Sequence, residues 1–188
     1  MLKIGIEQEF VFLNGAGDYV DADNTVYRDF AEIVDEFPAY EGDDCHLDCK
    51  SLETYPKRCY VEGFERHDMG GKLVATLPKA LEIRTIPHQT VSGVIKEFRE
   101  SWNGLMQIAR GRGLKPVLTS RHPFKNSLDI FREIGEEESR VRSEARLKLA
   151  KRAMFTHGLH VNVSLQGYSE ERLLDLVEKV NYYTPSII

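Results

Sequence analysis

Residues 2–13 alternate between apolar and polar positions. Ile4, Ile6 and Phe10 occupy one set of alternate positions, and Glu7 and Glu9 occupy the other. A period of two is typical of a β-strand with one packed face, because successive side chains of a strand point to opposite sides of its sheet. The pattern therefore predicts a strand over residues 2–13, and the glycine-rich segment 15–18 predicts a turn after it.

The same period of two recurs later in the chain. It predicts further strands over residues 57–66, 73–76, 80–86, 114–118 and 156–165. Apolar residues at helical spacing, together with capping residues, predict helices over residues 24–37, 91–110, 136–154 and 169–183. We expect Asn24 or Thr25 to cap the first helix, Pro38 to end it, and Ser169 to cap the last. Residues 40–55 are polar and show neither the period of two of a strand nor the spacing of a helix.

Strands that come in pairs between long helices predict an α+β fold, in which an antiparallel β-sheet has helices packed on one face. An antiparallel sheet can leave its other face open to solvent or to a ligand. A chain of 188 residues fits one domain with a sizeable core, and no repeat or linker composition divides it. We therefore expect a single domain over residues 1–188.

The composition excludes several classes of protein. Apolar residues make up 41% of the chain and charged residues 29%, as in ordinary globular proteins, and the net charge of −5 provides no basic surface for nucleic acid. No apolar run approaches the roughly 20 residues that a membrane span needs. Glu7 and Glu9 interrupt what would be the apolar core of a signal peptide. A cytoplasmic protein with no nucleic-acid or membrane partner is expected.

Two of the three cysteines lie close together in the sequence. Cys45, His46 and Cys49 form a short cluster, and Cys59 follows it. Thiolates and imidazole are good zinc ligands, so one hypothesis is a zinc-stabilised structural protein. Buried or loop thiols, or a redox-active pair of Cys45 and Cys49, account for the same residues without a metal. An odd number of cysteines argues against a secreted disulfide framework.

Three of the predicted strands carry polar side chains on one face. Each pairs them two residues apart: Glu7 with Glu9, Glu82 with Arg84, and His160 with Asn162. One interpretation is that these faces contact solvent. The other is a metal site, because burying an unpaired carboxylate is very costly and because Mg²⁺ and Mn²⁺ prefer oxygen ligands. Glu62, on the strand predicted over residues 57–66, is either a fourth carboxylate of such a site or an ordinary surface residue.

Four segments resemble motifs of one family. The segment 5–10 (GIEQEF) looks like the opening G-x-E-x-E-F strand of the second glutamate–cysteine ligase family, the carboxylate–amine ligases. The segment 81–87 (LEIRTIP) looks like its E-x-x-T-x-P strand, and 119–124 (TSRHPF) resembles its G-x-H-P-F turn. The segment 158–163 (GLHVNV) resembles its G-x-H-V-H-V strand, and with Ser164 and Leu165 it is also similar to a strand of glutamine synthetase.

This resemblance implies a glutamine-synthetase-like fold and an acyl-phosphate mechanism. In that mechanism ATP phosphorylates a glutamate-like carboxylate, and an amine then attacks to form a γ-glutamyl-type amide. The resemblance assigns the following residues: Glu7, Glu9, Glu82 and His160 as ligands of Mg²⁺ or Mn²⁺ that hold ATP, Asn162 as a further ATP contact, and Arg84 and His157 as contacts to substrate or phosphate.

The motifs span the whole chain but match only the N-terminal half of the family pattern. We therefore expect an ATP- and Mg-dependent ligase or the N-terminal half of one, acting on amino-acid-like small molecules. A homo-oligomer or a complementing second polypeptide would complete it. The alternative is a non-catalytic nucleotide- or metal-binding protein on the same fold.

Overall fold

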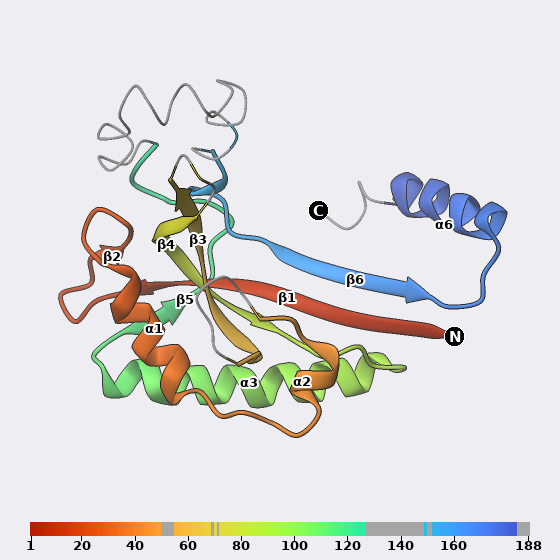
Figure 1. Ribbon diagram of the computed structural model, residues 1–188, viewed down its shortest axis with the longest axis horizontal. Coiled ribbons are helices and arrows are strands. Elements are labelled where there is room, and N and C mark those ends of the chain that lie inside the picture. The colour runs from red at the N-terminus through yellow and green to blue at the C-terminus, as the bar shows by residue number, and fades with distance from the viewer. Residues whose placement is uncertain (50–54, 69, 71, 127–148, 150–151, 184–188) are drawn as a thin grey trace.

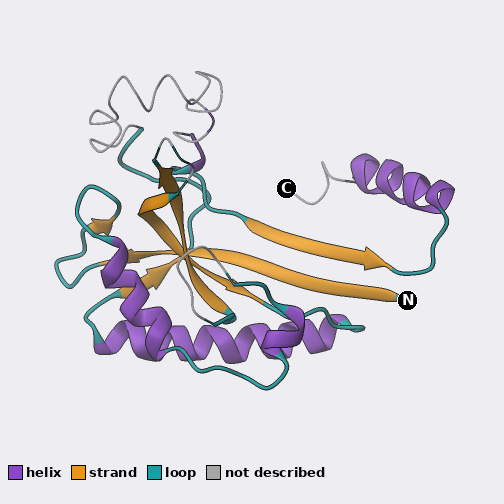
Figure 2. Cartoon of the chain, in the orientation of Figure 1, coloured by secondary structure: helices purple, strands orange, loops and turns teal. Residues whose placement is uncertain are grey.

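The computed structural model describes residues 1–49, 55–68, 70, 72–126, 149 and 152–183, and within them the fold is mixed α/β with an open antiparallel sheet (Figures 1 and 2). In chain order the elements are β1 (Leu2–Leu13), β2 (Tyr19–Val20), α1 (Tyr27–Glu36), α2 (Asp43–His46), β3 (Cys59–His67), β4 (Leu73–Arg84), α3 (Val91–Gly111), β5 (Lys115–Val117), β6 (Leu159–Leu165) and α6 (Glu170–Tyr183). The coarse prediction of an antiparallel sheet with helices is confirmed.

Strand β1 lies at the centre of the sheet. It pairs with β4 through Glu7–Phe10 along one edge and with β6 through Leu2–Gln8 along the other. Its C-terminal end pairs with β2 and β5, and β3 adds to the far edge of β4. All of these pairings are antiparallel. The segments 5–10, 81–84 and 159–163, which carry three of the four motifs, therefore lie on neighbouring strands.

Helices α1 and α3 cover one face of this sheet (Figure 1). Phe10 and Ile83 project from the sheet into a buried core that also contains Ile33 of α1 and Leu105 of α3, each at most 1% exposed. The rings of Phe10 and Trp102 stack with their centroids 4.6 Å apart. Full burial of each such side chain contributes about 1.5–3 kcal/mol, so the packed face supplies most of the stability of the fold.

A β-bulge interrupts the pairing of β3 with β4. Glu62 lies opposite Ala80 and Gly63 lies opposite Pro78, so Lys79 is an extra residue on β4 without a partner position. Bulges bend a strand and redirect a side chain. Adjacent residues of a regular strand point to opposite faces, but at this bulge Lys79 points to the same face as Ala80, away from the helices. A Cβ atom at Gly63 would lie 2.2 Å from the carbonyl oxygen of Leu77, so only glycine fits opposite the bulge.

The predicted helix boundaries are wrong at the start of α1. The N-cap is Val26 rather than Asn24 or Thr25. Its backbone N–H and the hydroxyl of Thr25 donate to the carboxylate of Asp29, which satisfies this end of the helix from within. Asn24 instead holds the preceding turn, because its side-chain oxygen accepts from the N–H of Asp21.

The other predicted elements are closer to the structure. The segments predicted over 73–76 and 80–86 form the single strand β4, and the gap between them is the bulge. Ser169 precedes α6, and its hydroxyl accepts from the N–H of Arg172 at 3.4 Å. Residues 40–55, which carry no period, include the one-turn helix α2. Most of the helix predicted over 136–154 lies outside the described residues.

Apolar side chains on β6 and α6 remain exposed. Leu159, Val161 and Val163 each have more than half of their surface exposed, and so do Leu174 and Val177 of α6. The β6 residues face the same side of the sheet as Phe10, but beyond the region that the helices cover. Among the described helices, none has the length and apolar character needed to cross a lipid bilayer.

We predict that Gly63→Ala lowers the free energy of unfolding by about 2 kcal/mol or more, because the added methyl group collides with the backbone of β4 at the bulge. Urea unfolding followed by circular dichroism measures the loss. Gly15→Ala is the matched control, since nothing lies within 4 Å of the position its Cβ would occupy. Equal stability of the two variants would contradict the assigned bulge geometry.

Candidate metal centre

The face of the sheet opposite the helices carries the predicted polar residues. The strand register places Glu7 between Arg84 of β4 and His160 of β6, and it places Glu9 opposite Glu82. Side chains directly opposite each other on paired strands point to the same side of the sheet. The sequence prediction that these residues share one face is therefore confirmed.

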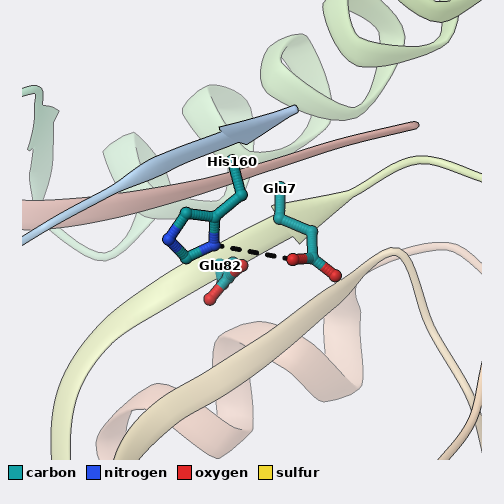
Figure 3. A group of neighbouring side chains, drawn as sticks. All are labelled: Glu7, Glu82 and His160. Atoms are coloured by element: carbon teal, nitrogen blue, oxygen red, sulfur yellow. Dashed lines mark ion pairs between the residues drawn. The ribbon is translucent and has the colours of Figure 1, made fainter. Parts of the chain in front are cut away.

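Three of these side chains converge closely enough to hold one ion (Figure 3). One ligand atom each of Glu7, Glu82 and His160 lies within 4.8 Å of the other two. The Nδ1 atom of His160 lies 3.6 Å from Oε2 of Glu7. Ligands on opposite sides of a Mg²⁺ ion are about 4.2 Å apart, because each bond measures about 2.1 Å. Small side-chain rotations would therefore close the group around an ion. The two carboxylates are ligands that Mg²⁺ and Mn²⁺ prefer, and the imidazole is a third donor.

A glycine positions the imidazole of this group. A Cβ atom at Gly158 would lie 2.7 Å from Nε2 of His160, so the ring rests against the bare backbone of the residue two positions earlier. Glu82 is 3% exposed, whereas the side chain of His160 is 58% exposed and that of Glu7 33%. The group is thus anchored on its buried side and open to solvent on the other.

The carboxyl of Glu82 has a strongly perturbed acidity. Its burial raises its pKa from an ordinary value of 4.5 to about 7; a hydrogen bond from Tyr60 opposes the rise, and the charges of Glu62, Glu9 and Glu7 add to it. A buried carboxylate surrounded by other carboxylates lacks compensating positive charge. When this carboxyl loses its proton, a bound cation would neutralise the charge that appears.

Glu9 lies outside this group, although it was predicted to be a metal ligand. Its Oε1 accepts a hydrogen bond from the Lys79 ammonium at 2.7 Å, and both side chains are buried. Its Oε2 accepts from the N–H of Gly158 at 3.3 Å and lies 3.5 Å from Nδ1 of His157. Burial alone would raise the pKa of the Glu9 carboxyl, but the contacts with His157, Lys79 and Gly158 lower it below its ordinary value.

His157 is buried behind the site rather than presented to a substrate. Its side chain is 2% exposed, and its Nε2 lies 3.0 Å from the hydroxyl of Tyr19. Burial, and after it the charge of Asp21, raises the pKa of Tyr19, so its hydroxyl keeps its proton. The other ring nitrogen of His157, Nδ1, faces Glu9. The predicted contact of His157 with substrate has no support in this placement.

Arg84 is held by backbone oxygens at the edge of the site. Its guanidinium donates to the carbonyl oxygens of Lys57 and Asp48 and lies over the ring of Tyr60, 4.8 Å from the centroid. Its side chain is 4% exposed. Arg84 thus fastens the segments on either side of residues 50–54 to the sheet, which is a structural role rather than the predicted contact with a free ligand.

The remaining predicted residues flank the group. Glu62 lies on β3 opposite Ala80 and is close enough to raise the pKa of Glu82 by its charge, but it is not one of the three converging ligands. Asn162 lies opposite Gly5, exposed and one alternate position beyond His160 on β6. Both lie where an occupant larger than one ion would extend.

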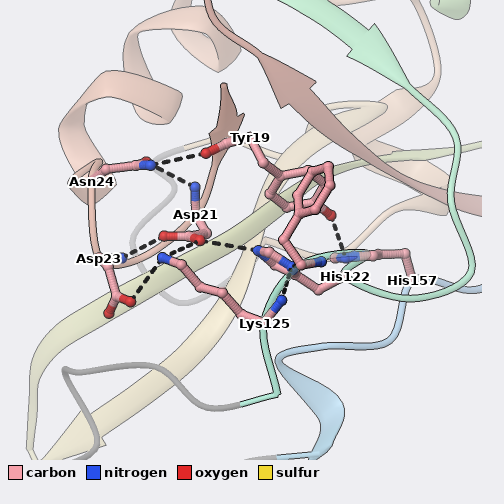
Figure 4. A network of polar contacts seen from close by, with 8 residues as sticks. Tyr19, Asp21, Asp23, Asn24, His122, Lys125 and His157 are labelled. Carbon is pink, nitrogen blue, oxygen red and sulfur yellow. Dashed lines mark hydrogen bonds and ion pairs between the residues drawn. The ribbon is translucent and has the colours of Figure 1, made fainter. Parts of the chain in front are cut away.

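A second polar network, which the sequence patterns do not reveal, adjoins the site (Figure 4). Nδ1 of His122 accepts from the N–H groups of Phe124 and Lys125, so its Nε2 carries the proton and donates it to Asp21. The Lys125 ammonium lies 2.8 Å from the same carboxylate. His122 therefore closes the turn of the segment 119–124 and fastens it to the loop after β2. The ring of His122 also packs against Tyr19, which connects this network to His157.

The zinc hypothesis fails on the described residues. Cys59 is completely buried in the core beneath the helices, whereas Cys45 and Cys49 are exposed. Within the described part of the chain, no group of three or more potential ligands other than Glu7, Glu82 and His160 is close enough for a metal ion. All three cysteines are free thiols.

We predict that Glu82→Gln stabilises the metal-free protein at alkaline pH. Between pH 4.5 and 7 the unfolded carboxyl has lost its proton and the folded one retains it, so rising pH favours the unfolded chain. Relative to wild type, the variant should gain about 2 kcal/mol of unfolding free energy between pH 5 and pH 8. Urea titrations in chelator at both pH values measure this gain. The exposed Glu41→Gln serves as control, and a difference that does not depend on pH would contradict the assignment.

Comparison with known proteins does not identify the chain. Its sequence matches no protein-family model, and it matches no curated protein. What the protein does must therefore be inferred from the polar face itself.

Proposed function

We propose that the protein is a metal-dependent ATP-binding protein of the carboxylate–amine ligase type, with Mg²⁺ or Mn²⁺ held by Glu7, Glu82 and His160. The observation that carries the proposal is the convergence of these three ligand atoms within 4.8 Å on the open face of the sheet. A divalent ion there supplies the positive charge that neutralises phosphate oxygens.

The remaining support comes from how the three strands are arranged. The segments that resemble ligase motifs belong to β4, β1 and β6, which lie side by side, and their polar positions share one face. The same arrangement accounts for nucleotide binding without a glycine-rich phosphate loop, which the sequence lacks. ATP would lie over this face with its phosphates towards Glu7 and His160, the two exposed ligands.

In this proposal the residues of the chain bind and orient. Gly158 and Glu7 fix the orientation of the His160 ring, and Tyr60 holds the carboxylate of Glu82 by a hydrogen bond. The substrate carboxylate would approach from the solvent side, near Asn162 and Glu62. Phosphate transfer from ATP to that carboxylate, followed by attack of an amine, would then give an amide, ADP and phosphate.

A non-catalytic binding protein is the second candidate, and one observation favours it. Arg84 and His157, the residues expected to contact phosphate or substrate, are both buried and engaged by the protein itself. A ligase needs further positive groups to stabilise the transferring phosphate. If the chain is a ligase, they would come from a second copy or a complementing polypeptide, and the exposed apolar side chains of β6 and α6 are compatible with such a partner.

We predict that wild-type protein binds Mn²⁺ and Mg·ATP and that Glu7→Gln weakens Mn²⁺ binding at least tenfold, because a carboxylate ligand becomes a neutral amide. Gly158→Ala should weaken binding as well, since its methyl group displaces the His160 ring. Isothermal titration calorimetry at pH 8 measures both effects. Asp18→Asn, a change in the exposed turn after β1, is the control.

The same samples separate the two candidate functions. Release of ADP that requires Mg²⁺, glutamate and an amine together would establish a ligase, and Glu7→Gln should abolish it. Tight Mg·ATP binding without ADP release under any substrate combination would establish the binding protein. Failure of wild type to bind either Mn²⁺ or ATP would exclude both.

A further inference from the structure

We infer that the ammonium of Lys79 takes the place of a metal ion at Glu9. The polar face of the sheet is thereby limited to a single divalent ion. The inference rests on the proposed metal centre and goes beyond it, because the resemblance to ligases counts Glu9 among the ligands. The geometry instead separates Glu9, whose charge Lys79 neutralises, from Glu7 and Glu82, which remain available to an external cation.

Both carboxylate oxygens of Glu9 face groups of the protein itself. Oε1 binds the Lys79 ammonium at 2.7 Å, and Oε2 faces the N–H of Gly158 and the Nδ1 of His157. A metal ion that recruited Glu9 would have to displace the ammonium. Lys79 would then be a buried charge without a partner, and loss of one member of a buried ion pair is strongly unfavourable.

The fold commits Lys79 to this position. The bulge at residues 78–80 turns its side chain to the polar face, where it is 8% exposed. Gly63 permits the bulge, because any side chain there would strike the backbone at Leu77. A surface lysine could swing into solvent when a metal arrives, but the side chain of Lys79 is buried.

A second ion on this face would draw on the carboxylates that flank Glu82, which include Glu62 and Glu9. Paired catalytic ions lie about 3.5–4 Å apart and share carboxylates between them. Glu82 is a ligand of the proposed first ion, and Glu9 lies directly opposite it on the neighbouring strand. Glu9 is thus a carboxylate beside the proposed first ion, and the ammonium of Lys79 already neutralises it.

The test counts bound ions. Mn²⁺ titrations followed by calorimetry, with free Mn²⁺ measured by electron paramagnetic resonance, should give one ion per wild-type chain. Lys79→Met keeps the length of the side chain but removes its charge, so Glu9 becomes available and the count should rise to two. The double variant Lys79→Met with Glu9→Gln should return the count to one.

The single variant Glu9→Gln tests the inference independently, in case Lys79→Met does not fold. The amide oxygen of glutamine still accepts the hydrogen bond from Lys79 but lacks the charge, so this variant should be less stable than wild type and, once circular dichroism shows it folded, should still bind one ion. Loss of the ion in Glu9→Gln would show that Glu9 is a ligand and would overturn the inference. Two ions in wild type, or one in both wild type and folded Lys79→Met, would overturn it too while leaving the metal centre in place. No bound ion in wild type would instead refute the metal centre itself.

Discussion

The register of β1 between β4 and β6 is the constraint on which the polar face depends. Glu7 has a neighbour on each side, Arg84 on one strand and His160 on the other, and this alignment also brings Glu82 within reach diagonally. A slip of one residue would turn Glu7 towards the helices and Phe10 towards solvent. The stacked rings of Phe10 and Trp102 oppose such a slip. The apolar core therefore fixes the geometry of the polar site, although it contributes no atom to it.

The sequence was sufficient to predict which residues share this face, but not which of its carboxylates are free to bind a metal ion. A period of two in residues 2–13 and 156–165 places Glu7 and His160 correctly, because alternation is a local property of a strand. The role of Glu9 depends on Lys79, and the direction of Lys79 depends on a bulge. The only signal of that bulge was the break in alternation between the strands predicted over 73–76 and 80–86. Which strands would pair was also beyond a local pattern.

Cys59 and His122 differ in how far a local sequence pattern can place them. Cys59 alternates with Tyr60, which puts it on the packed face and away from any zinc site shared with the exposed Cys45. His122 lies in a short turn motif whose function is not visible in the sequence. In the structure its ring satisfies two backbone N–H groups of its own turn and one distant carboxylate. Contacts that join residues about a hundred positions apart follow only from the tertiary fold.

The polar face combines two ways of placing a carboxylate in a low-dielectric environment. Glu9 is neutralised internally by Lys79 and sits in a buried network that continues through His157 and Tyr19. The pKa of Glu82 is raised by burial first and then by the charges of its neighbours, and the hydrogen bond from Tyr60 opposes the rise; the contacts of Glu9 instead lower its pKa despite its burial. A fold selected for stability alone would neutralise both. Glu82 beside the accessible Glu7 and His160 destabilises the folded protein as the pH rises above the ordinary carboxyl pKa, and a cation bound there would relieve that destabilisation.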